Sequence, residues 1–172
     1  MSDARRDEAY GLLLQLHEMI DQMAEPLHVV HQARLQCKRG CSGCCVDDLT
    51  VFEIEAHRIR TEHASLLEAG APAPAGGCAF LDDEGACRIY HARPYVCRTQ
   101  GLPLRWLEQE DDGVAEYRDI CPLNVDPKEP LEVLDAQVCW PIGPVEQKLA
   151  AFQEAFGGPE MKRVSLRSLF EP

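Results

Sequence analysis

The sequence lacks any hydrophobic run long enough to cross a membrane, and it has few basic residues. Its 172 residues include 17 Lys and Arg against 29 Asp and Glu, which gives a formal net charge of −12. This acidic balance argues against binding to nucleic-acid phosphates or to anionic lipid. The first apolar stretch is interrupted by Gln15, Glu18 and Asp21, so no secretory signal is visible. We therefore expect a cytoplasmic protein that binds neither nucleic acid nor membrane.

Motifs of several common enzyme classes are also missing. The chain has no glycine-rich loop of the kind that holds phosphates, no nucleophile elbow, and no spacing typical of a Ser-His-Asp triad. The composition, 45% hydrophobic and 27% charged, is that of an ordinary globular protein. The length predicts a single domain over residues 1–172.

Cysteine is unusually abundant, with nine residues in the chain. The count is odd, and Cys44 and Cys45 are adjacent, so a disulfide framework fits poorly. In a reducing compartment, clustered cysteines are typical of metal ligands or nucleophiles. Four of them lie within nine residues: Cys37, Cys41, Cys44 and Cys45. Four buried hydrophobic residues are the alternative interpretation, but the Lys-Arg-Gly and Ser-Gly steps between them make a poor core segment.

The spacing of these cysteines bears on the choice of metal. Thiolates are soft ligands that suit both zinc and iron–sulfur clusters. Only Cys41 and Cys44 have the Cys-x2-Cys spacing, whereas a zinc ribbon needs two such pairs. The adjacent Cys44 and Cys45 reach one mononuclear ion only with strain. They therefore indicate two sites, two metals of one cluster, or one site and another role. We favour an iron–sulfur cluster over zinc, and the number of sites stays open.

Hydrophobic periodicity predicts an α+β fold that is mostly helical. Pro26 should interrupt the first helix or open a second one, and a Thr50-x-x-Glu53 capping box should begin another. The segment 102–120 is ambiguous. The expected helices cover residues 5–24, 51–67, the region around 131–138, and 145–156.

The non-helical segments are predicted to carry the metal centre. Residues 38–45 should form a tight loop, and residues 78–90 a β-hairpin with an Asp- and Gly-rich turn. A cysteine-lined centre would then join the 37–45 loop, the 78–97 hairpin and Cys121 between flanking helices. Such a centre ties distant segments together, so metal loss should destabilise the fold.

Several short motifs resemble one known family. They are Cys37-x3-Cys41-x2-Cys44-Cys45, Leu49-Thr50-x-x-Glu53, Cys78-x-Phe80-Leu81, Cys87-x-Ile89-Tyr90-x-x-Arg93-Pro94-x-x-Cys97-Arg98, and Cys121-Pro122-Leu123-Asn124. Together they resemble the YkgJ-type cysteine-cluster family, also called the CxxCxxCC zinc- or iron-chelating domain. The resemblance covers residues 37–124, which we interpret as the metal-binding core. The first gap is one residue longer than the family's nickname implies.

The resemblance implies a set of eight metal-directed cysteines. They are Cys37, Cys41, Cys44, Cys45, Cys78, Cys87, Cys97 and Cys121. Cys139 lies outside the pattern and is expected to be a spare or structural thiol. Arg93 and Arg98 flank Cys97, where guanidinium groups could donate hydrogen bonds to sulfur from the second shell. The alternative for Arg93 is that it anchors the Arg-Pro turn through backbone carbonyls.

Three functions fit these residues. The first is a metal-binding protein that holds iron–sulfur or zinc and has a redox or accessory role. The second is a structural zinc module that contacts a protein partner, and the acidic composition would suit a basic one. The third is an iron–sulfur-dependent transferase or oxidoreductase. Cys37-x3-Cys41-x2-Cys44 has the radical S-adenosylmethionine spacing, but Gly43 replaces the usual aromatic residue and the chain lacks a barrel pattern. The sequence does not decide whether the chain is an enzyme.

Overall fold

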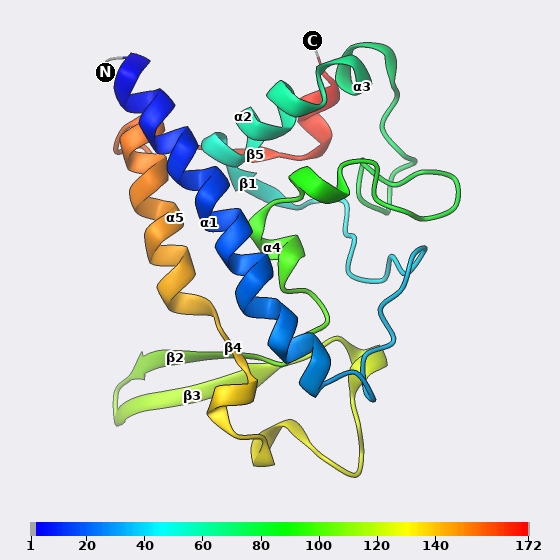
Figure 1. Ribbon diagram of the computed structural model, residues 1–172, viewed down its shortest axis with the longest axis vertical. Coiled ribbons are helices and arrows are strands. Elements are labelled where there is room, and N and C mark those ends of the chain that lie inside the picture. Colours follow the sequence, from blue (N-terminus) through cyan, green and yellow to red (C-terminus); the bar gives the residue numbers. More distant parts are fainter. Residues whose placement is uncertain (1–2, 172) are drawn as a thin grey trace. The chain divides into compact units, whose positions relative to one another are not determined.

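The computed structural model describes residues 3–171 and has an α+β fold in which helices predominate, as predicted (Figure 1). The chain forms two compact units. Unit 1 comprises Met1–Leu16, Lys38–Pro94 and Leu149–Pro172, and unit 2 comprises His17–Cys37 and Tyr95–Lys148. Helices α1 (Asp3–Val30) and α5 (Ile142–Gly157) each contribute residues to both units. The single domain over residues 1–172 stays a prediction.

Unit 1 is built around a two-stranded sheet and the helices that follow it. Strand β1 (Thr50–Phe52) pairs antiparallel with β5 (Arg163–Ser165), with Val51 opposite Val164. Helices α2 (Glu53–Glu62) and α3 (Ala64–Ala69) come next, and a short helix η5 (Arg167–Phe170) closes the chain. The buried core consists of Val51, Ala56, Ile59, Phe80, Ile89, Val164, Leu166 and Leu169. Burial of each large side chain contributes about 1.5–3 kcal/mol.

The predicted helix over residues 51–67 is confirmed in part: helices α2 and α3 cover most of it, but it is divided at His63 and its predicted start is wrong. Thr50 begins strand β1 rather than a capping box, and its Oγ1 accepts a hydrogen bond from Arg163 Nε at 3.1 Å. The side chain of Phe52, the N-cap of α2, makes no capping bond. Instead Gln153 of α5 supplies Oε1 to the backbone N–H of Ile54, at 2.9 Å. The strand pairing and this cap both come from distant residues, so the local pattern could not reveal them.

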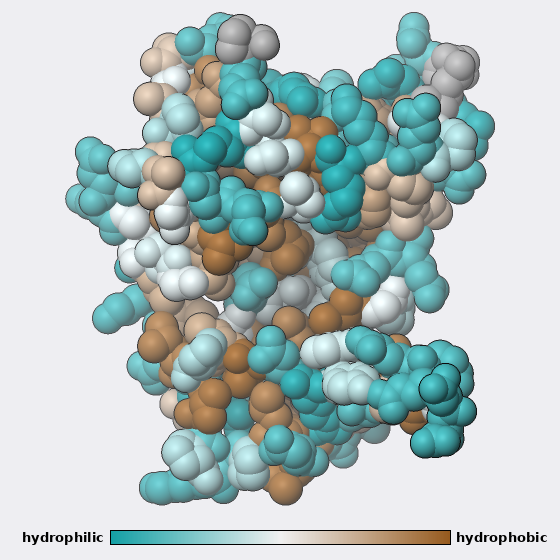
Figure 2. Space-filling view, turned by 180° about the vertical axis from the view of Figure 1, so that it is seen from behind, coloured by the Kyte–Doolittle hydropathy of each residue, from teal (hydrophilic) through white to brown (hydrophobic). Residues whose placement is uncertain are grey.

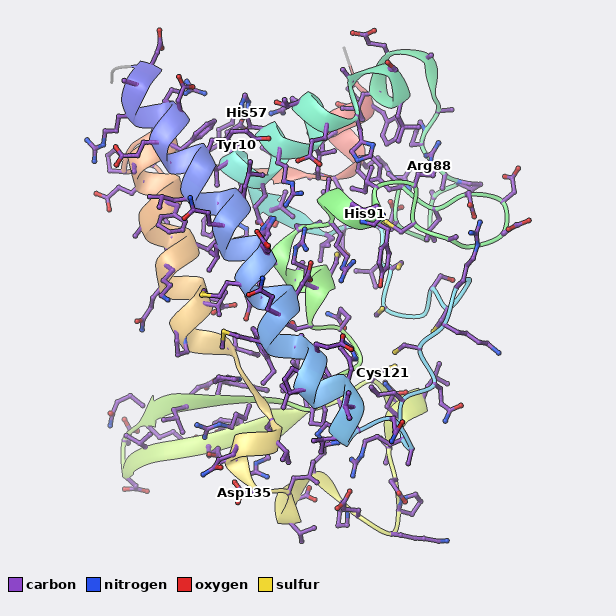
Figure 3. All side chains as sticks on the ribbon, in the orientation of Figure 1. Tyr10, His57, Arg88, His91, Cys121 and Asp135 are labelled. Atoms are coloured by element: carbon purple, nitrogen blue, oxygen red, sulfur yellow. The ribbon has the colours of Figure 1, made fainter. Side chains whose placement is uncertain are left out.

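Aromatic packing joins the helices of unit 1. His57 of α2 lies between Tyr10 of α1 and Phe156 of α5, with ring centroids 5.1 Å from each (Tyr10 and His57 are labelled in Figure 3). Arg6 stacks over the Phe156 ring at 4.4 Å. Burial, together with the nearby positive charge of Arg6, lowers the pKa of His57 below its ordinary value. The ring therefore packs in its neutral form at neutral pH.

Unit 2 contains a three-stranded sheet in the order β3-β2-β4. Strands β2 (Leu104–Glu110) and β3 (Gly113–Asp119) form an antiparallel hairpin, and β4 (Trp140–Pro141) pairs parallel with β2. The hairpin resolves the ambiguous 102–120 segment. Trp106 lies opposite Tyr117, and their rings stack with centroids 5.8 Å apart, which stabilises the strand pair.

Two further expectations need correction in unit 2. Helix α1 runs through Pro26 to Val30 instead of breaking. A proline removes one intrahelical hydrogen bond, whereas Ile20 and Ala24 ahead of it are buried and hold the helix in place. The predicted helix around residues 131–138 is a pair of short 3₁₀ helices, η3 (Leu131–Val133) and η4 (Ala136–Val138). Helix α5 confirms the predicted helix over 145–156.

The surface of unit 2 carries several strongly exposed apolar side chains. Leu107, Val114, Leu123 and Val133 each expose 60% or more of their surface. Figure 2 shows that apolar patches interrupt a mostly hydrophilic face of the molecule. Within residues 3–171, no helix combines the length and apolar character that a membrane span requires.

Candidate metal centre

All nine cysteines lie in the described part of the chain and are reduced thiols rather than disulfides. Five of them lie in unit 1 and four in unit 2. Unit 1 holds Cys41, Cys44, Cys45, Cys78 and Cys87, and unit 2 holds Cys37, Cys97, Cys121 and Cys139. Reduced thiols are the form that binds thiophilic metals once the proton is lost.

The 38–45 segment is a tight loop, as predicted. The Cys41 N–H donates to Lys38 O and the Cys45 N–H donates to Ser42 O, each at 2.9 Å. Gly40 has a φ of +82°, and a Cβ atom there would lie 3.1 Å from the backbone oxygen of Glu84. Glycine therefore lets the loop lie directly against the turn at residues 82–86.

The predicted β-hairpin over residues 78–90 is a chain reversal with one β-bridge, between Leu81 and Cys87. Arg88 N–H donates to Phe80 O at 2.8 Å, and Asp82 Oδ1 accepts from the N–H groups of Glu84 and Ala86. The Asp82 side chain thus holds the turn. The loop and the hairpin of the predicted centre do lie together in unit 1.

Cys78 and Cys87 share one local arrangement. The backbone of Phe80 hydrogen-bonds the Cys78 sulfur, and the backbone of Ile89 hydrogen-bonds the Cys87 sulfur. Both thiols also pack against the core of unit 1. Burial raises the pKa of each thiol, and these N–H groups oppose that rise because they stabilise the thiolate. The arrangement therefore provides donors for a sulfur that becomes charged on metal binding.

Cys44 differs from these two thiols. A hydrogen bond with the side chain of its neighbour Cys45 lowers the pKa of Cys44 to about 6, against the opposing effect of burial. At neutral pH, Cys44 is therefore largely a thiolate. It is also exposed, so it is accessible to a metal ion.

Two hydrogen bonds, one of them between backbone groups, join the loop to the segment around Cys78. The Cys78 N–H donates to Cys45 O at 2.8 Å, and the Gly76 N–H donates to Asp47 Oδ2 at 2.9 Å. Cys45 and Cys78 therefore lie next to each other in the backbone, although 32 residues separate them in the sequence.

In unit 2, Asn124 organises the surroundings of Cys37. Its fully buried side chain donates from Nδ2 to Cys37 Sγ at 3.5 Å and to Gly101 O at 2.8 Å, and its Oδ1 accepts from Gln36 N–H at 2.8 Å. Its own N–H donates to Cys121 O at 2.8 Å, within the short helix η2 (Pro122–Asn124) that follows Cys121 (labelled in Figure 3). Asn124 thus links two of the predicted ligands.

Gly101 completes this arrangement. Its φ is +92°, and a Cβ atom there would lie 2.5 Å from Cys37 Sγ. Any other residue would displace the sulfur, so glycine makes room for it. Sequence reasoning missed Asn124 and Gly101 as site residues, although Asn124 stood in the quoted Cys121-Pro122-Leu123-Asn124 motif.

The two arginines have defined partners. Arg93 donates to Tyr90 O at 3.0 Å and stacks on the Tyr90 ring at 4.0 Å, as expected for a turn anchor, and its charge also acts to lower the pKa of Cys87. Arg98 is buried at the end of α4 (Tyr95–Arg98), the helix that contains Cys97, and pairs with Asp21 at 2.5 Å. That either arginine donates a hydrogen bond to a metal-bound sulfur stays a prediction.

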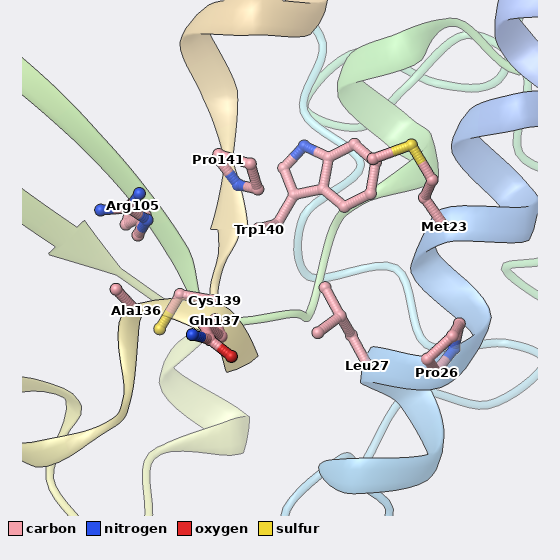
Figure 4. A pocket seen from close by; sticks show the side chains of 9 residues that line it. All are labelled: Met23, Pro26, Leu27, Arg105, Ala136, Gln137, Cys139, Trp140 and Pro141. Atoms are coloured by element: carbon pink, nitrogen blue, oxygen red, sulfur yellow. The ribbon is translucent and has the colours of Figure 1, made fainter.

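Cys139 lies apart from the predicted ligand set. It is buried and lines a cavity of about 450 Å³ within unit 2, together with Met23, Leu27 and Trp140 (Figure 4). Burial raises its pKa, so the thiol is protonated at neutral pH. These surroundings suit a packing residue.

Among residues 3–171 there is no group of three or more His, Cys, Asp or Glu side chains placed to hold a metal ion. The eight-cysteine ligand set therefore stays a prediction. The donor chemistry itself fits a thiophilic metal, because the thiols are reduced, hydrogen-bonded at sulfur, and in one case ionised.

Thiol donors in this number are typical of metal-chelating proteins. Residues 36–122 match the family model "CxxCxxCC: Putative zinc- or iron-chelating domain". The match spans half of the chain, and the chain belongs to this family. It includes all eight predicted ligands and leaves out Cys139 and Asn124. The comparison with curated proteins and the comparison with solved structures each found no match.

Proposed function

We propose that this chain binds iron as an iron–sulfur cluster through the cysteines of the matched domain, and that it has a redox or accessory role. The observation that carries the proposal is the adjacent pair Cys44 and Cys45: the pKa of the Cys44 thiol is lowered to about 6, and the Cys45 backbone carbonyl accepts a hydrogen bond from the Cys78 N–H. Adjacent cysteines suit a centre with more than one metal better than a mononuclear site. When bound, such a cluster would supply one-electron redox chemistry.

The proposed ligands are the eight cysteines of the matched domain. The chain's own donors stabilise the sulfurs in their charged form. Phe80 and Ile89 do so for Cys78 and Cys87, and Asn124 does so for Cys37. Hydrogen bonds to sulfur are among the features that set the potential of a cluster, so these residues would tune it.

A structural zinc module for contact with a protein partner is the second candidate. The tight turn through Cys41, with its Cys-x2-Cys spacing to Cys44, favours this alternative. In either case we propose a cytoplasmic protein, because reduced thiols need a reducing compartment. The net charge of −12 supports a basic protein partner and no binding to nucleic acid or membrane.

The test is elemental analysis and an absorption spectrum of protein purified without oxygen. We expect a brown protein that contains iron and sulfide, and colourless protein with bound zinc would support the zinc module instead. Cys44→Ala and Cys87→Ala should each lose metal and become sensitive to protease, whereas the matched control Cys139→Ala should keep its metal. Wild-type protein without iron or zinc, or normal metal content in both ligand variants, would overturn the proposal.

A further inference from the structure

Arg167 makes an unusual set of contacts for a residue 45 positions beyond the matched domain. Its Nε and Nη2 pair with the carboxylate of Asp47, two residues after Cys45. Its Nη1 donates to Ala73 O at 2.8 Å, and its Nη2 donates to Gly77 O at 3.0 Å, immediately before Cys78. One guanidinium group therefore contacts both cysteine-bearing segments of unit 1.

The position of Arg167 is fixed by the core of unit 1. Its neighbour Leu166 is buried and donates its N–H to Leu49 O at 3.0 Å, and Leu169 is buried one turn later. The side chains of Arg167 and Asp47 expose only 27% and 28% of their surface. The buried neighbours of Arg167 therefore fix its backbone. Its planar guanidinium can then donate to Asp47 and to the carbonyl groups of residues 71–77 at the same time.

The segments that Arg167 joins have little structure of their own. Residues 71–77 contain no helix or strand, so their carbonyl groups need donors from elsewhere. Arg167 supplies donors to the carbonyls of Ala73 and Gly77. Apart from this group, the hydrogen bonds from Cys78 N–H to Cys45 O and from Gly76 N–H to Asp47 Oδ2 link residues 45–47 to residues 76–78.

We propose that Arg167 is a positioning residue for metal binding, which holds Cys45 and Cys78 in their relative placement before the metal arrives. This inference rests on the proposed metal-binding function. It assigns a role to the C-terminal segment, which lies outside the matched domain. Removal of a group that orients ligands lowers metal affinity by about 10–100-fold.

The test uses Co²⁺ titration of the metal-free full-length chain, followed by the thiolate-to-cobalt absorption band. We expect Arg167→Ala to bind Co²⁺ about 10–100-fold more weakly than wild type and to have a weaker band per bound ion. Arg167→Lys should recover part of the affinity, because it keeps the charge but not the planar donors. Arg163→Ala is the matched control, since Arg163 lies on the same segment and contacts Thr50 and Phe52 instead.

The thermal midpoint of each metal-free variant separates positioning from stability. Arg167→Ala should lose more stability than Arg163→Ala, because it loses an ion pair and more hydrogen bonds, and only Arg167→Ala should lose Co²⁺ affinity at a temperature where both variants are folded. Asp47→Asn, a milder change, should weaken Co²⁺ binding in the same direction, and its effect should not add to that of Arg167→Ala. Equal affinity of Arg167→Ala and Arg163→Ala would overturn this inference alone. Wild-type chain that binds neither Co²⁺ nor iron would overturn the proposed function itself.

Discussion

Different interactions hold the cysteine-bearing segments in place in unit 1 and in unit 2. In unit 1, the loop segments 38–47 and 71–89 are bridged by Arg167, which pairs with Asp47 and donates to Ala73 O and Gly77 O. The exposed ion pair Arg39–Glu84 and single hydrogen bonds add to this bridge. In unit 2, the fully buried Asn124 donates hydrogen bonds to Cys37 Sγ, to Gly101 O and, from its backbone N–H, to Cys121 O. We call these four residues the Asn124 cradle.

This difference has a physical consequence. The charges of Asp47 and Arg167 are partly exposed, so water and salt can compensate in part when their contact is altered. A buried neutral amide has no such freedom, because each hydrogen bond that it loses leaves a buried group without a partner. The cysteines of unit 1 should therefore tolerate substitution nearby better than those of the Asn124 cradle.

The largest effect should come from Gly101→Ala in the Asn124 cradle. The new Cβ would lie 2.5 Å from Cys37 Sγ at a φ of +92°, so both sterics and backbone oppose it. We expect a loss of about 1–3 kcal/mol in unfolding free energy and a clear loss of bound metal. Urea unfolding and metal analysis measure the two effects.

Gly158→Ala provides the control for Gly101→Ala. Gly158 has a similar φ of +88°, but no atom lies within 4 Å of its Cβ position. It should show the backbone penalty alone and keep its metal. Equal metal loss in both variants would contradict the cradle.

A smaller effect is expected for Asn124→Asp. The side chain keeps its shape but exchanges the Nδ2 donor for a negative oxygen beside Cys37 Sγ and Gly101 O. We expect metal affinity about 10–100-fold below wild type, by comparison with other residues that orient ligands. Co²⁺ titration measures it. Asp47→Asn replaces a carboxylate by an amide in unit 1, and it should lower Co²⁺ affinity less than Asn124→Asp does. A larger loss of affinity in Asp47→Asn would contradict our comparison of the two units.

The smallest change concerns thiol reactivity rather than stability. With a pKa of about 6, Cys44 of unit 1 should be alkylated first in metal-free protein at pH 7, with a rate that rises through about pH 6 as the thiol ionises. Cys139 of unit 2 should react last, because it is buried and its pKa is raised. Mass spectrometry of iodoacetamide-treated protein identifies the order. In Cys45→Ala the pKa of Cys44 should rise toward its ordinary value, and an unchanged rate profile would exclude the hydrogen bond as its cause.

Several features could be read directly from the sequence, because they depend on neighbouring residues. The cysteine loop at 38–45, the turn around Asp82 and the helix α5 all follow from local spacing. The eight thiols and the family also follow, because residue type and spacing define them. The predicted boundaries of helices were wrong where contacts with residues distant in the sequence override the local preference. Thr50, for example, pairs with Ser165 in a strand instead of capping a helix.

The sequence by itself determined which atoms are available for metal binding, since thiol chemistry belongs to the residue type. Only the tertiary structure decided how these thiols are supported. Arg167 meets Asp47 across 120 positions, Asn124 meets Cys37 across 87, and Gln153 caps Ile54 across 99. No short-range pattern contains such contacts, because they exist only after the core has formed and has brought the segments together.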